Sequence, residues 1–566
     1  MKIKLIGLMV SLFLLAGTAV AQTFINLTPR PKSISVKAGQ QLTLPSKFSI
    51  SHSGLAEEEV NEVKRFADLY AAVTGAEVSV VADDADALFQ VSKLDATSKL
   101  KDSGYTLAVT SDKVNIQAKS ATGFFYAFQS VKKLLPANVM AGKKDPLATE
   151  HAIPMYTIPL VPISDEPRFD YRGFMLDVSR HFFTVDEVKR MLDVMSYYKM
   201  NAFHWHLTDD QGWRVEIKKY PKLTTVGSIA PNSLFTDLYE AKQYWINKPY
   251  GPYFYTQDEI RDVVAYAKER HITIVPEVDM PGHSSAAMAS YPEYSCSPSG
   301  GQQVWSKGGI SYDVINVANP AAVQFAKDVL SEIMDLFPGE RIHIGGDEAP
   351  RTRWKKCPKC QARIRTEKLK ADKNHTAEDR LQSYCMTRIE KLLNSKGRQI
   401  IGWDEILEGD VAPNATVMSW RGSAGGIKAA QLGHDVIMTP NDYCYFDYYQ
   451  SEDTRHEPFA IGGFVPLEKV YSLNPTASLT EEQAKHILGT QANLWTEYIP
   501  TSEQVEYMVL PRMAALAEVQ WTQLEKKDYT NFTTRLAGLI GLYRRDGLNY
   551  REPFRQQADS TATEKK

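Results

Sequence analysis

From residue 168 onward, short apolar runs alternate with amphipathic segments. Eight such runs can be counted, and they centre on residues 174–176, 202–206, 272–275, 342–344, 400–403, 417–420, 436–438 and 487–490. Between many of them the apolar positions follow a helical spacing, as in residues 185–200, 258–270, 321–337 and 381–393. Eight strands alternating with helices over roughly 350 residues predict an α/β fold, a (β/α)8 TIM barrel with insertions. An open doubly wound sheet is the alternative, but no glycine-rich dinucleotide fingerprint follows any run.

Residues 22–165 show a mixed pattern that predicts a small α+β domain ending in a proline-punctuated linker. Residues 57–73 carry a helical apolar stripe, residues 105–109 and 114–118 alternate as a hairpin does, and residues 122–135 predict a second helix. This part shows no obvious site, so the barrel at residues 166–555 is expected to carry the chemistry. A last amphipathic helix around Phe532 and Tyr543 should pack on the barrel, and the polar tail at 556–566 is expected to be disordered.

The N-terminus has the three parts of a secretory signal peptide. Lys2 and Lys4 precede an apolar run at residues 5–15, and Ala19-Val20-Ala21 offers a cleavage site. The run is shorter than the ~20 apolar residues that a membrane-spanning helix needs, and no later stretch reaches that length. We therefore expect residues 1–21 to be removed and the protein to be exported, periplasmic or secreted, without stable membrane insertion.

The charge balance narrows the range of partners. The chain has 65 Lys and Arg against 68 Asp and Glu, a formal net charge of -3. Such a balance gives no sign of nucleic acid binding. The sequence leaves open whether the protein is a monomer or a homodimer.

The five cysteines are Cys296, Cys357, Cys360, Cys385 and Cys444. In an exported chain they allow at most two disulfides. The Cys-Pro-Lys-Cys motif at 357–360 could be a redox pair or half of a zinc site, but no second Cys-x-x-Cys or His-x-x-x-His follows, and no thioredoxin-like unit surrounds it. The expected role of this motif is a local constraint on a loop, and no metal or cofactor is expected.

Polar and aromatic residues gather where the predicted strands end, which is where TIM barrels build their active sites. The central pair, Asp347-Glu348, follows the fourth strand and two glycines, Gly345 and Gly346. The glycines let the backbone turn, so that both carboxylates can reach one cleft. Taken alone, the pair fits a helix cap equally well. The other strand ends lie at Asp177 and at residues 204–210, 277–283, 403–405, 420–421, 443–449 and 495–497.

Three tryptophans, Trp403, Trp420 and Trp495, fall at the ends of strands five, six and eight. Any one alone fits a packing role, because tryptophan is usually largely buried. Three at corresponding positions, each beside a carboxylate or an arginine, indicate a pocket for a sugar ring, which needs flat apolar walls and a few oriented polar groups.

Histidines mark the neighbouring strand ends. His204 and His206 share one strand face with Asp209 nearby, which allows a metal site, although the loose spacing favours hydrogen-bonded support instead. His283 is a candidate to contact or orient Glu348, and a buried core histidine is the alternative.

The motifs are recognisable as a set. The chain carries Arg-Gly at 172–173, His-Trp-His-Leu-Thr-Asp-Asp at 204–210, Pro-Glu-Val-Asp-Met-Pro-Gly-His at 276–283, His-Ile-Gly-Gly-Asp-Glu at 343–348, Gly-Trp-Asp-Glu at 402–405, Ser-Trp-Arg-Gly at 419–422 and Leu-Trp-Thr-Glu at 494–497. In this order they resemble glycoside hydrolase family 20, the exo-acting β-N-acetylhexosaminidases. The resemblance runs from the N-terminal domain through the whole barrel.

The resemblance implies removal of terminal β-linked N-acetylglucosamine or N-acetylgalactosamine from glycans or oligosaccharides, with retention and without an enzyme nucleophile. The substrate's own acetamido oxygen attacks the anomeric carbon and gives an oxazolinium intermediate. By resemblance, Glu348 is the acid and base, Asp347 orients the acetamido group, and Tyr445 holds its oxygen. No cofactor is implied.

The resemblance also implies a set of binding residues. Trp403, Trp420 and Trp495 would enclose the sugar, while Arg172, Asp447 and Glu497 would bond its hydroxyls. Arg172 and Glu497 are expected to distinguish the two amino sugars. Three alternatives stay open: a relative that releases a disaccharide, a metal-dependent hydrolase using His204, His206 and Asp279, and a sugar-binding protein without catalysis.

Overall fold

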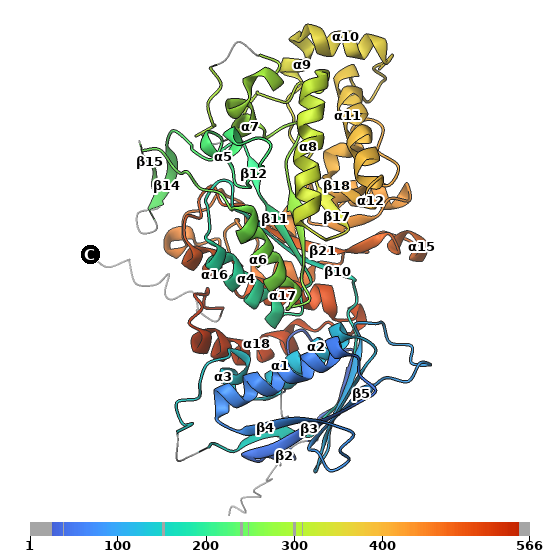
Figure 1. Ribbon diagram of the computed structural model, residues 1–566, viewed down its shortest axis with the longest axis vertical. Coiled ribbons are helices and arrows are strands. Elements are labelled where there is room, and N and C mark those ends of the chain that lie inside the picture. The colour runs from blue at the N-terminus through green and yellow to red at the C-terminus, as the bar shows by residue number, and fades with distance from the viewer. Residues whose placement is uncertain are drawn as a thin grey trace, which may run out of the picture.

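The computed structural model describes residues 25, 27–37, 39–149, 153–237, 242–246, 248–297, 301–307 and 309–553. The predicted signal peptide at 1–21 and the predicted tail at 556–566 lie outside these residues. Figure 1 shows two parts stacked along the long axis, an N-terminal domain in blue and a larger domain running from green to red. None of the helices in the described residues combines the length and the apolar character that a membrane span requires.

The larger domain is a closed barrel of eight parallel strands, which confirms the predicted fold. In order around the barrel they are β10 (Tyr171–Asp177), β11 (Ala202–His206), β16 (Thr273–Glu277), β17 (Arg341–His343), β18 (Gln399–Trp403), β19 (Thr416–Ser419), β20 (Val436–Met438) and β21 (Ile487–Leu494). Each contains or overlaps one of the eight apolar runs. The runs are nearly continuous because both faces of these strands are buried, by the barrel interior on one side and by helices on the other.

Helices follow most of the strands and cover the barrel. They include α4 (Val185–Tyr197), α6 (Gln257–Lys268), α8 (Pro320–Leu336), α11 (Ala377–Asn394), α12 (Ala424–Gln431), α16 (Ser502–Val509), α17 (Arg512–Trp521) and α18 (Tyr529–Asp546). Thr184 and Thr256 begin α4 and α6 with capping boxes, which satisfy the first free backbone N–H groups of each helix. After β18 the chain makes only a short 3-10 helix, η2 (Asp404–Leu407), so the carboxylates of this segment stay at the carboxyl end of the barrel.

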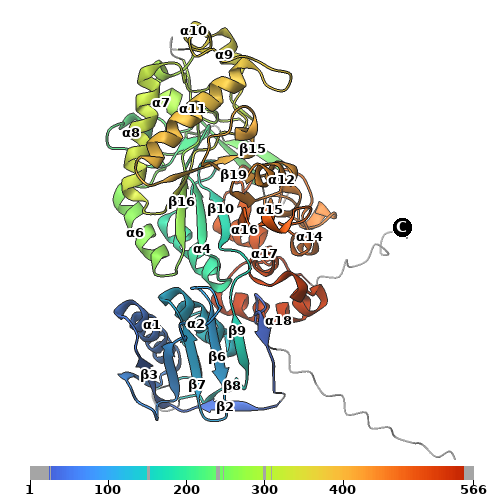
Figure 2. The ribbon, with the colours of Figure 1, turned by 90° about the vertical axis from the view of Figure 1, so that its right-hand side faces the viewer.

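The N-terminal domain is a seven-stranded sheet with helices on one face. The strand order is β1 (Ser33–Ile34), β9 (Pro162–Asp165), β6 (Tyr105–Val109), β7 (Val114–Ala118), β5 (Phe89–Lys93), β3 (Lys47–Ser53) and β4 (Glu77–Ala82). The predicted hairpin is the antiparallel pair β6 and β7. The two predicted helices are α1 (Glu57–Thr74) and α2 (Ala121–Leu134), and Figure 2 shows them between the sheet and the barrel.

The two domains share buried contacts at the amino ends of the barrel strands. Trp521, at the end of α17, packs into the core of the N-terminal domain and donates from Nε1 to Asp165 Oδ1 at 2.9 Å. Asp165 is fully buried and lies 3.1 Å from Lys199 Nζ. These contacts join the domains at the face of the barrel opposite the predicted site.

Candidate active site

Asp347 and Glu348 lie just beyond β17, where the backbone turns sharply. Gly345 and Gly346 have φ angles of +69° and +98°, and Glu348 has +43°. A Cβ atom at residue 345 would lie 1.6 Å from Asp279 Oδ1, so only glycine fits there. The next helix, α9 (Thr352–Lys356), begins after Arg351 and has no side-chain cap. The alternative of a helix cap is therefore wrong, and the turn instead directs both carboxylates to one histidine.

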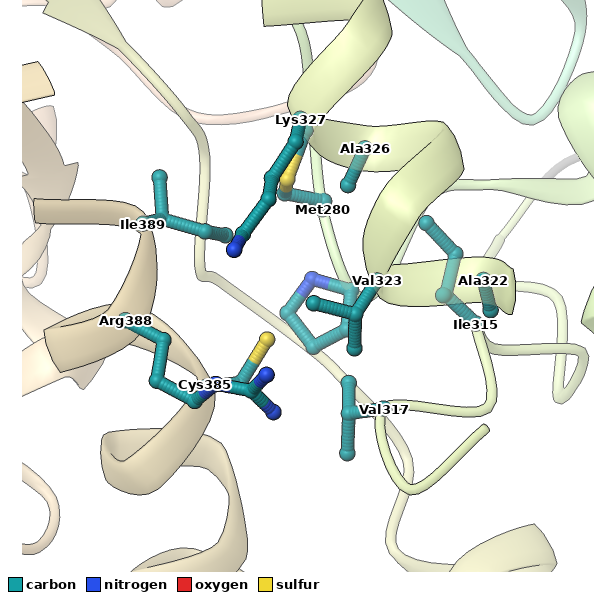
Figure 3. Close-up of a pocket in the computed structure, with 11 residues that line it drawn as sticks. Met280, Ile315, Val317, Ala322, Val323, Ala326, Lys327, Cys385, Arg388 and Ile389 are labelled. Carbon is teal, nitrogen blue, oxygen red and sulfur yellow. The ribbon is translucent and has the colours of Figure 1, made fainter. Parts of the chain in front are cut away.

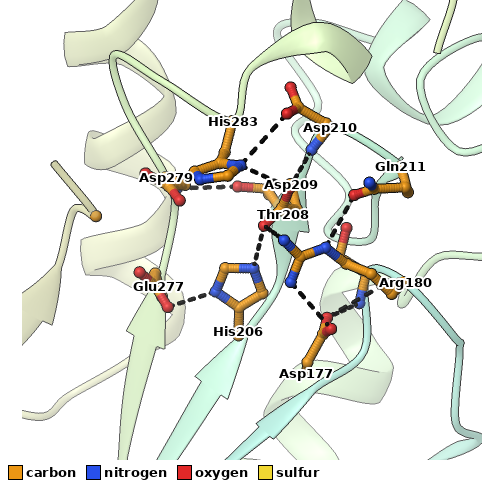
Figure 4. Close-up of polar contacts among 12 residues, drawn as sticks. Asp177, Arg180, His206, Thr208, Asp209, Asp210, Gln211, Glu277, Asp279 and His283 are labelled. Atoms are coloured by element: carbon orange, nitrogen blue, oxygen red, sulfur yellow. Dashed lines mark hydrogen bonds and ion pairs between the residues drawn. The ribbon is translucent and has the colours of Figure 1, made fainter. Parts of the chain in front are cut away.

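That histidine is His283, in the loop after β16. Its Nε2 lies 3.6 Å from Asp347 Oδ2 and 3.4 Å from Glu348 Oε2. On the other side of the ring, Nδ1 lies 3.2 Å from Asp209 Oδ1 and 3.3 Å from Asp210 Oδ2 (Figure 4). Burial alone would lower the pKa of His283, but the negative charges of Asp209 and Asp347 raise it well above its ordinary value. The structure thus brings His283 to the two carboxylates as predicted.

The two carboxylates occupy different environments. Asp347 is 7% exposed, and its Oδ1 has no hydrogen-bond partner among the described residues. Burial raises the pKa of Asp347 to about 6, with Glu277 and Glu348 adding to the rise and His283 opposing it. The side chain of Glu348 is 36% exposed and faces an open cleft. One acid is thus enclosed with a free acceptor oxygen, while its neighbour has access to solvent.

Aromatic rings from the ends of four consecutive strands, β18 to β21, gather beside this pair. Trp420 and Tyr445 lie nearly parallel, with centroids 6.1 Å apart. Trp495 is 6.5 Å from Tyr445 and 5.9 Å from Trp403. Trp403 is only 1% exposed, and its Nε1 donates to Glu277 at 2.9 Å, so it forms part of the barrel core beneath the other rings.

Beneath the site, the buried Glu277 carboxylate is surrounded by histidines from several strands. His343 Nδ1 and His204 Nε2 each lie 2.9 Å from a Glu277 oxygen, and His206 Nδ1 bonds the same carboxylate. The bond from His206 to Glu277, and the bond between Gln491 Nε2 and His204 Nδ1 at 3.0 Å, are the hydrogen-bonded support predicted for these two histidines. Glu277 itself was not predicted as a functional residue, although its position at the end of the third barrel strand could have indicated one.

The three side chains of the metal-dependent alternative do not converge in the described structure. Asp279 groups with Asp209 and His283, whereas His204 groups with Glu277 and His343. The geometry therefore gives that alternative no support.

Arg172 does not belong to the site. It lies near the start of β10, at the end of the barrel opposite Asp347, and is 2% exposed. Its guanidinium donates to the carbonyls of Lys199 and Phe169 and to the Tyr126 hydroxyl, all within 2.9 Å. The predicted role in sugar binding is wrong, because residues at the start of a strand of a parallel barrel lie at the face away from the site.

Arg180, three residues past the end of β10, lies at the carboxyl end of the barrel, where Arg172 does not. Its Nη1 lies 3.2 Å from Asp177 Oδ2 and 3.8 Å from Glu497 Oε1, and its Nη2 lies 2.9 Å from Asp209 Oδ2. The guanidinium also lies over the Trp495 ring, 5.0 Å from its centroid. The signal was available, because Arg180 follows the carboxyl end of the first barrel strand.

Asp447 and Glu497 lie on the same side of the site as Arg180. Asp447 is 4% exposed, and its Oδ1 has no hydrogen-bond partner in the described part of the chain. Burial raises the pKa of Asp447 well above its ordinary value, and the charge of Glu497 adds to the effect. Two neighbouring carboxylates, one with a free oxygen, are suited to accept hydrogen bonds from hydroxyl groups.

Glu405, on η2, was not predicted as a functional residue. It accepts a hydrogen bond from Trp420 Nε1 at 2.9 Å. Burial, followed by the charges of Asp347 and Asp404, raises the pKa of Glu405 to about 8. Its bond to the indole fixes the orientation of one aromatic wall.

Two hollows open at this end of the barrel. One, of about 370 Å³, is lined by Glu348, Glu405, Trp420 and Arg421 among others. The other is lined by Arg180, Trp305, Glu497 and their neighbours. A separate crevice lies between α8 and α11, where Met280, Val323 and Cys385 face it (Figure 3). Its lining is apolar apart from Lys327 and Arg388, so it lacks the carboxylates and aromatic walls of the first two.

A family model described as the catalytic domain of glycosyl hydrolase family 20 matches residues 169–524, and its domain 2 matches residues 25–166. The chain belongs to glycosyl hydrolase family 20. It is 46% identical over 468 residues to a β-hexosaminidase of Porphyromonas gingivalis, covering 82% of this chain and 56% of that protein. It is 36% identical over 421 residues to a β-hexosaminidase of Vibrio furnissii, covering 74% and 65%. The chain thus spans less than two thirds of the length of these two relatives.

Solved structures of the family share both domains. The family 20 exo-β-N-acetylglucosaminidase from Vibrio harveyi, in complex with N-acetylglucosamine, is 32% identical with a TM-score of 0.80, covering 94% of this chain and 79% of that one. The Streptomyces plicatus N-acetyl-β-hexosaminidase is 28% identical with a TM-score of 0.78, covering 93% and 96%. The site described above therefore lies in a family 20 catalytic domain.

Proposed function

We propose that this family 20 member is an exo-acting, retaining β-N-acetylhexosaminidase that acts on glycans or oligosaccharides. The observation that carries the proposal is the different environment of the two adjacent carboxylates. Asp347 is enclosed and has a free acceptor oxygen, while Glu348 borders an open cleft of about 370 Å³. A buried acceptor suits an amide group of the sugar, and an accessible acid suits proton exchange with the leaving group and with water.

In the proposed reaction, the Glu348 carboxylic acid donates its proton to the glycosidic oxygen as the bond to the anomeric carbon breaks. The acetamido carbonyl oxygen of the same sugar attacks that carbon and closes an oxazolinium ring. The Glu348 carboxylate then takes a proton from water, which attacks the anomeric carbon and opens the ring. Two inversions at one carbon retain the configuration.

Asp347 and Tyr445 act on the acetamido group. The Asp347 carboxylate accepts a hydrogen bond from the amide N–H and balances the positive charge that develops there. Burial raises the pKa of Tyr445 well above its ordinary value, so its hydroxyl keeps its proton and donates to the amide oxygen. Orienting this oxygen for attack replaces an encounter with an external nucleophile.

The remaining residues fit recognition of a terminal sugar. Trp420, Trp495 and Tyr445 offer apolar walls, and Arg180, Asp447 and Glu497 offer hydrogen-bonding partners for ring hydroxyls. On the pattern of residues 1–21 we also propose that the protein is exported.

The test is release of nitrophenol from nitrophenyl β-N-acetylglucosaminide by the wild type and by Glu348→Gln. We expect Glu348→Gln to lower kcat by about 10²–10⁴, because it removes the proton donor, and to leave affinity for a thiazoline inhibitor close to that of the wild type. Glu340→Gln is the matched control, since the Glu340 side chain, one residue before β17, is more than half exposed. A nitrophenyl disaccharide tests the disaccharide-releasing alternative. A wild type that binds the inhibitor but releases no nitrophenol from either substrate contradicts the proposal and favours a sugar-binding protein.

A further inference from the structure

Three cysteines from the loops that follow β16 and β17 meet in the folded chain. Cys296 lies in the loop that follows β16, just after the 3-10 helix η1 (Pro292–Tyr294). Cys357 and Cys360 lie in the loop after β17, at the start of α10 (Pro358–Thr366). The sulfurs of all three lie within 4.8 Å of one another. The sequence showed the Cys-x-x-Cys pair alone, and folding brings the third sulfur from 61 positions upstream of Cys357.

The spacing of the sulfurs fits a shared metal ion better than a disulfide. Cys296 Sγ and Cys360 Sγ are 3.8 Å apart, and all five cysteines are free thiols, so the predicted local constraint through Cys357 and Cys360 is not a disulfide. A disulfide would need the sulfurs at about 2.05 Å and would leave one member of the trio unused. In a tetrahedral zinc site with Zn–S bonds of about 2.3 Å, two sulfurs are about 3.8 Å apart, which is the separation of this pair.

The residues around the three sulfurs hold them in fixed positions. Cys357 is the N-cap of α10 and Cys360 lies in its first turn, so the helix start fixes two of the sulfurs. Both are buried, at 5% and 0% exposure, while Cys296 is partly exposed and gives access from solvent. Asn316 lies between them, with Nδ2 3.6 Å from Cys357 Sγ and Oδ1 3.4 Å from Cys360 Sγ. The Asn316 amide N–H can donate to a Cys357 thiolate and orient it, as groups around metal ligands do.

The local charge also suits three thiolates. Three thiolates and one divalent ion carry a net charge of -1, a simple sum of formal charges. Residues 351–366 contain no Asp or Glu, and their basic members are Arg351, Arg353, Lys355, Lys356, Lys359, Arg363 and Arg365. Three of these, Arg351, Arg353 and Arg363, pair with nearby carboxylates, so the remaining basic residues of the segment are the ones that can offset the charge of the site.

We propose that Cys296, Cys357 and Cys360 bind a zinc ion as thiolates, with water in the fourth position on the side of Cys296. Binding releases the three thiol protons to solvent and changes no oxidation state. The ion ties the loop that carries His283 to the loop that carries Glu348. It therefore braces the acid/base residue from outside the cleft and takes no part in the chemistry.

The test measures metal and thiols in the same preparation. The full chain is purified through a tag that contains no histidine, from cells supplied with zinc, and its metal content is measured by mass spectrometry of the elements. We expect roughly one zinc per chain in the wild type, and less than about a tenth of that in Cys357→Ser, because two sulfurs hold zinc poorly. Cys385→Ser is the matched control, since Cys385 is buried and lines the separate crevice of Figure 3.

A second readout does not depend on any variant folding. The wild type, denatured with chelator, should show all five thiols to a thiol reagent, and cobalt in place of zinc should give a sulfur-to-metal charge-transfer band in the near ultraviolet. Three reactive thiols and a mass lower by two hydrogens would show a disulfide and overturn the proposal. Five thiols with no metal after dialysis against zinc would overturn it as well, as would zinc that stays in Cys357→Ser at the level of the Cys385→Ser control.

Discussion

Replacing Asp347 by asparagine should stabilise the fold while it removes most of the activity. Asparagine keeps the size of the side chain and resembles the protonated acid, so the change isolates the charge. In the folded protein burial raises the pKa of Asp347 from 3.8 to about 6. At neutral pH the native state therefore holds a carboxylate in an environment that favours its neutral form.

The magnitude follows from linkage between protonation and folding. The pKa of Asp347 rises by about two pH units on folding, and each unit corresponds to about 1.4 kcal/mol. The ionised Asp347 therefore lowers the free energy of unfolding by roughly 3 kcal/mol at pH 7.5. The native state binds the proton of Asp347 more tightly than the unfolded chain does. The folding free energy that this protonation contributes is therefore fully present below pH 3.8 and is lost as pH rises through about 6. The Asp347→Asn substitution avoids the loss, with a gain of about 3 kcal/mol at pH 7.5 and about 1 kcal/mol at pH 4.5. For a barrel of this size the larger gain corresponds to a rise in Tm of about 4 °C.

Activity should move in the opposite direction. If the carboxylate balances the positive charge on the amide in the transition state, its removal should lower kcat/KM for nitrophenyl β-N-acetylglucosaminide by about 10²–10³. Because the ionised form is the working one, kcat/KM of the wild type should fall as pH drops below about 6, the pKa of Asp347. The acidic limb of the pH profile and the Tm difference thus report the same group.

The matched control is Asp165→Asn. Asp165 is buried like Asp347, but it pairs with Lys199 Nζ at 3.1 Å and accepts from Trp521 Nε1. Removing its charge leaves Lys199 buried without a counter-ion, so this variant should lose about 3–5 kcal/mol. Thermal denaturation of both variants at the two pH values measures the contrast. An Asp347→Asn protein that is less stable than the wild type at pH 7.5, or one that keeps full activity, would refute the reasoning.

Two further predictions concern residues that the structure reassigned or constrained. Arg180→Ala should lower kcat/KM by about 10–100-fold and raise KM, because it removes charge-assisted bonds beside Glu497. Arg172→Ala should instead lower the free energy of unfolding by about 3–5 kcal/mol and leave the KM of the folded protein unchanged. Steady-state kinetics and denaturation distinguish the two variants, and the reverse pattern would contradict the reassignment of the site from Arg172 to Arg180. Gly345→Ala should abolish activity, because the added methyl would lie 1.6 Å from Asp279 Oδ1 and the backbone φ of +69° strains any residue other than glycine. A variant with normal steady-state kinetics would show that this turn is not needed.

The order of apolar runs was enough to predict the barrel. In a parallel barrel both faces of each strand are buried, so strands such as β10 and β11 read as continuous apolar runs, and intervening helices have a clear amphipathic period. The rule that active sites occupy the carboxyl ends of the strands then selected Asp347, Glu348, His283 and the tryptophans. The same rule, applied to the first strand, would have selected Arg180 in place of Arg172.

The sequence by itself determined the properties that depend on residues close together in the chain. These are the periods of the strands and helices, the glycine turn before Asp347, and the motifs that indicated the family. What only the tertiary structure decided were relations between residues far apart in the chain. The pKa of Asp347 depends on burial, on His283 and on Glu277, and the cysteine cluster depends on two loops folding side by side. Electrostatic interactions and metal coordination act across a few ångströms of space, and sequence separation gives no measure of that distance.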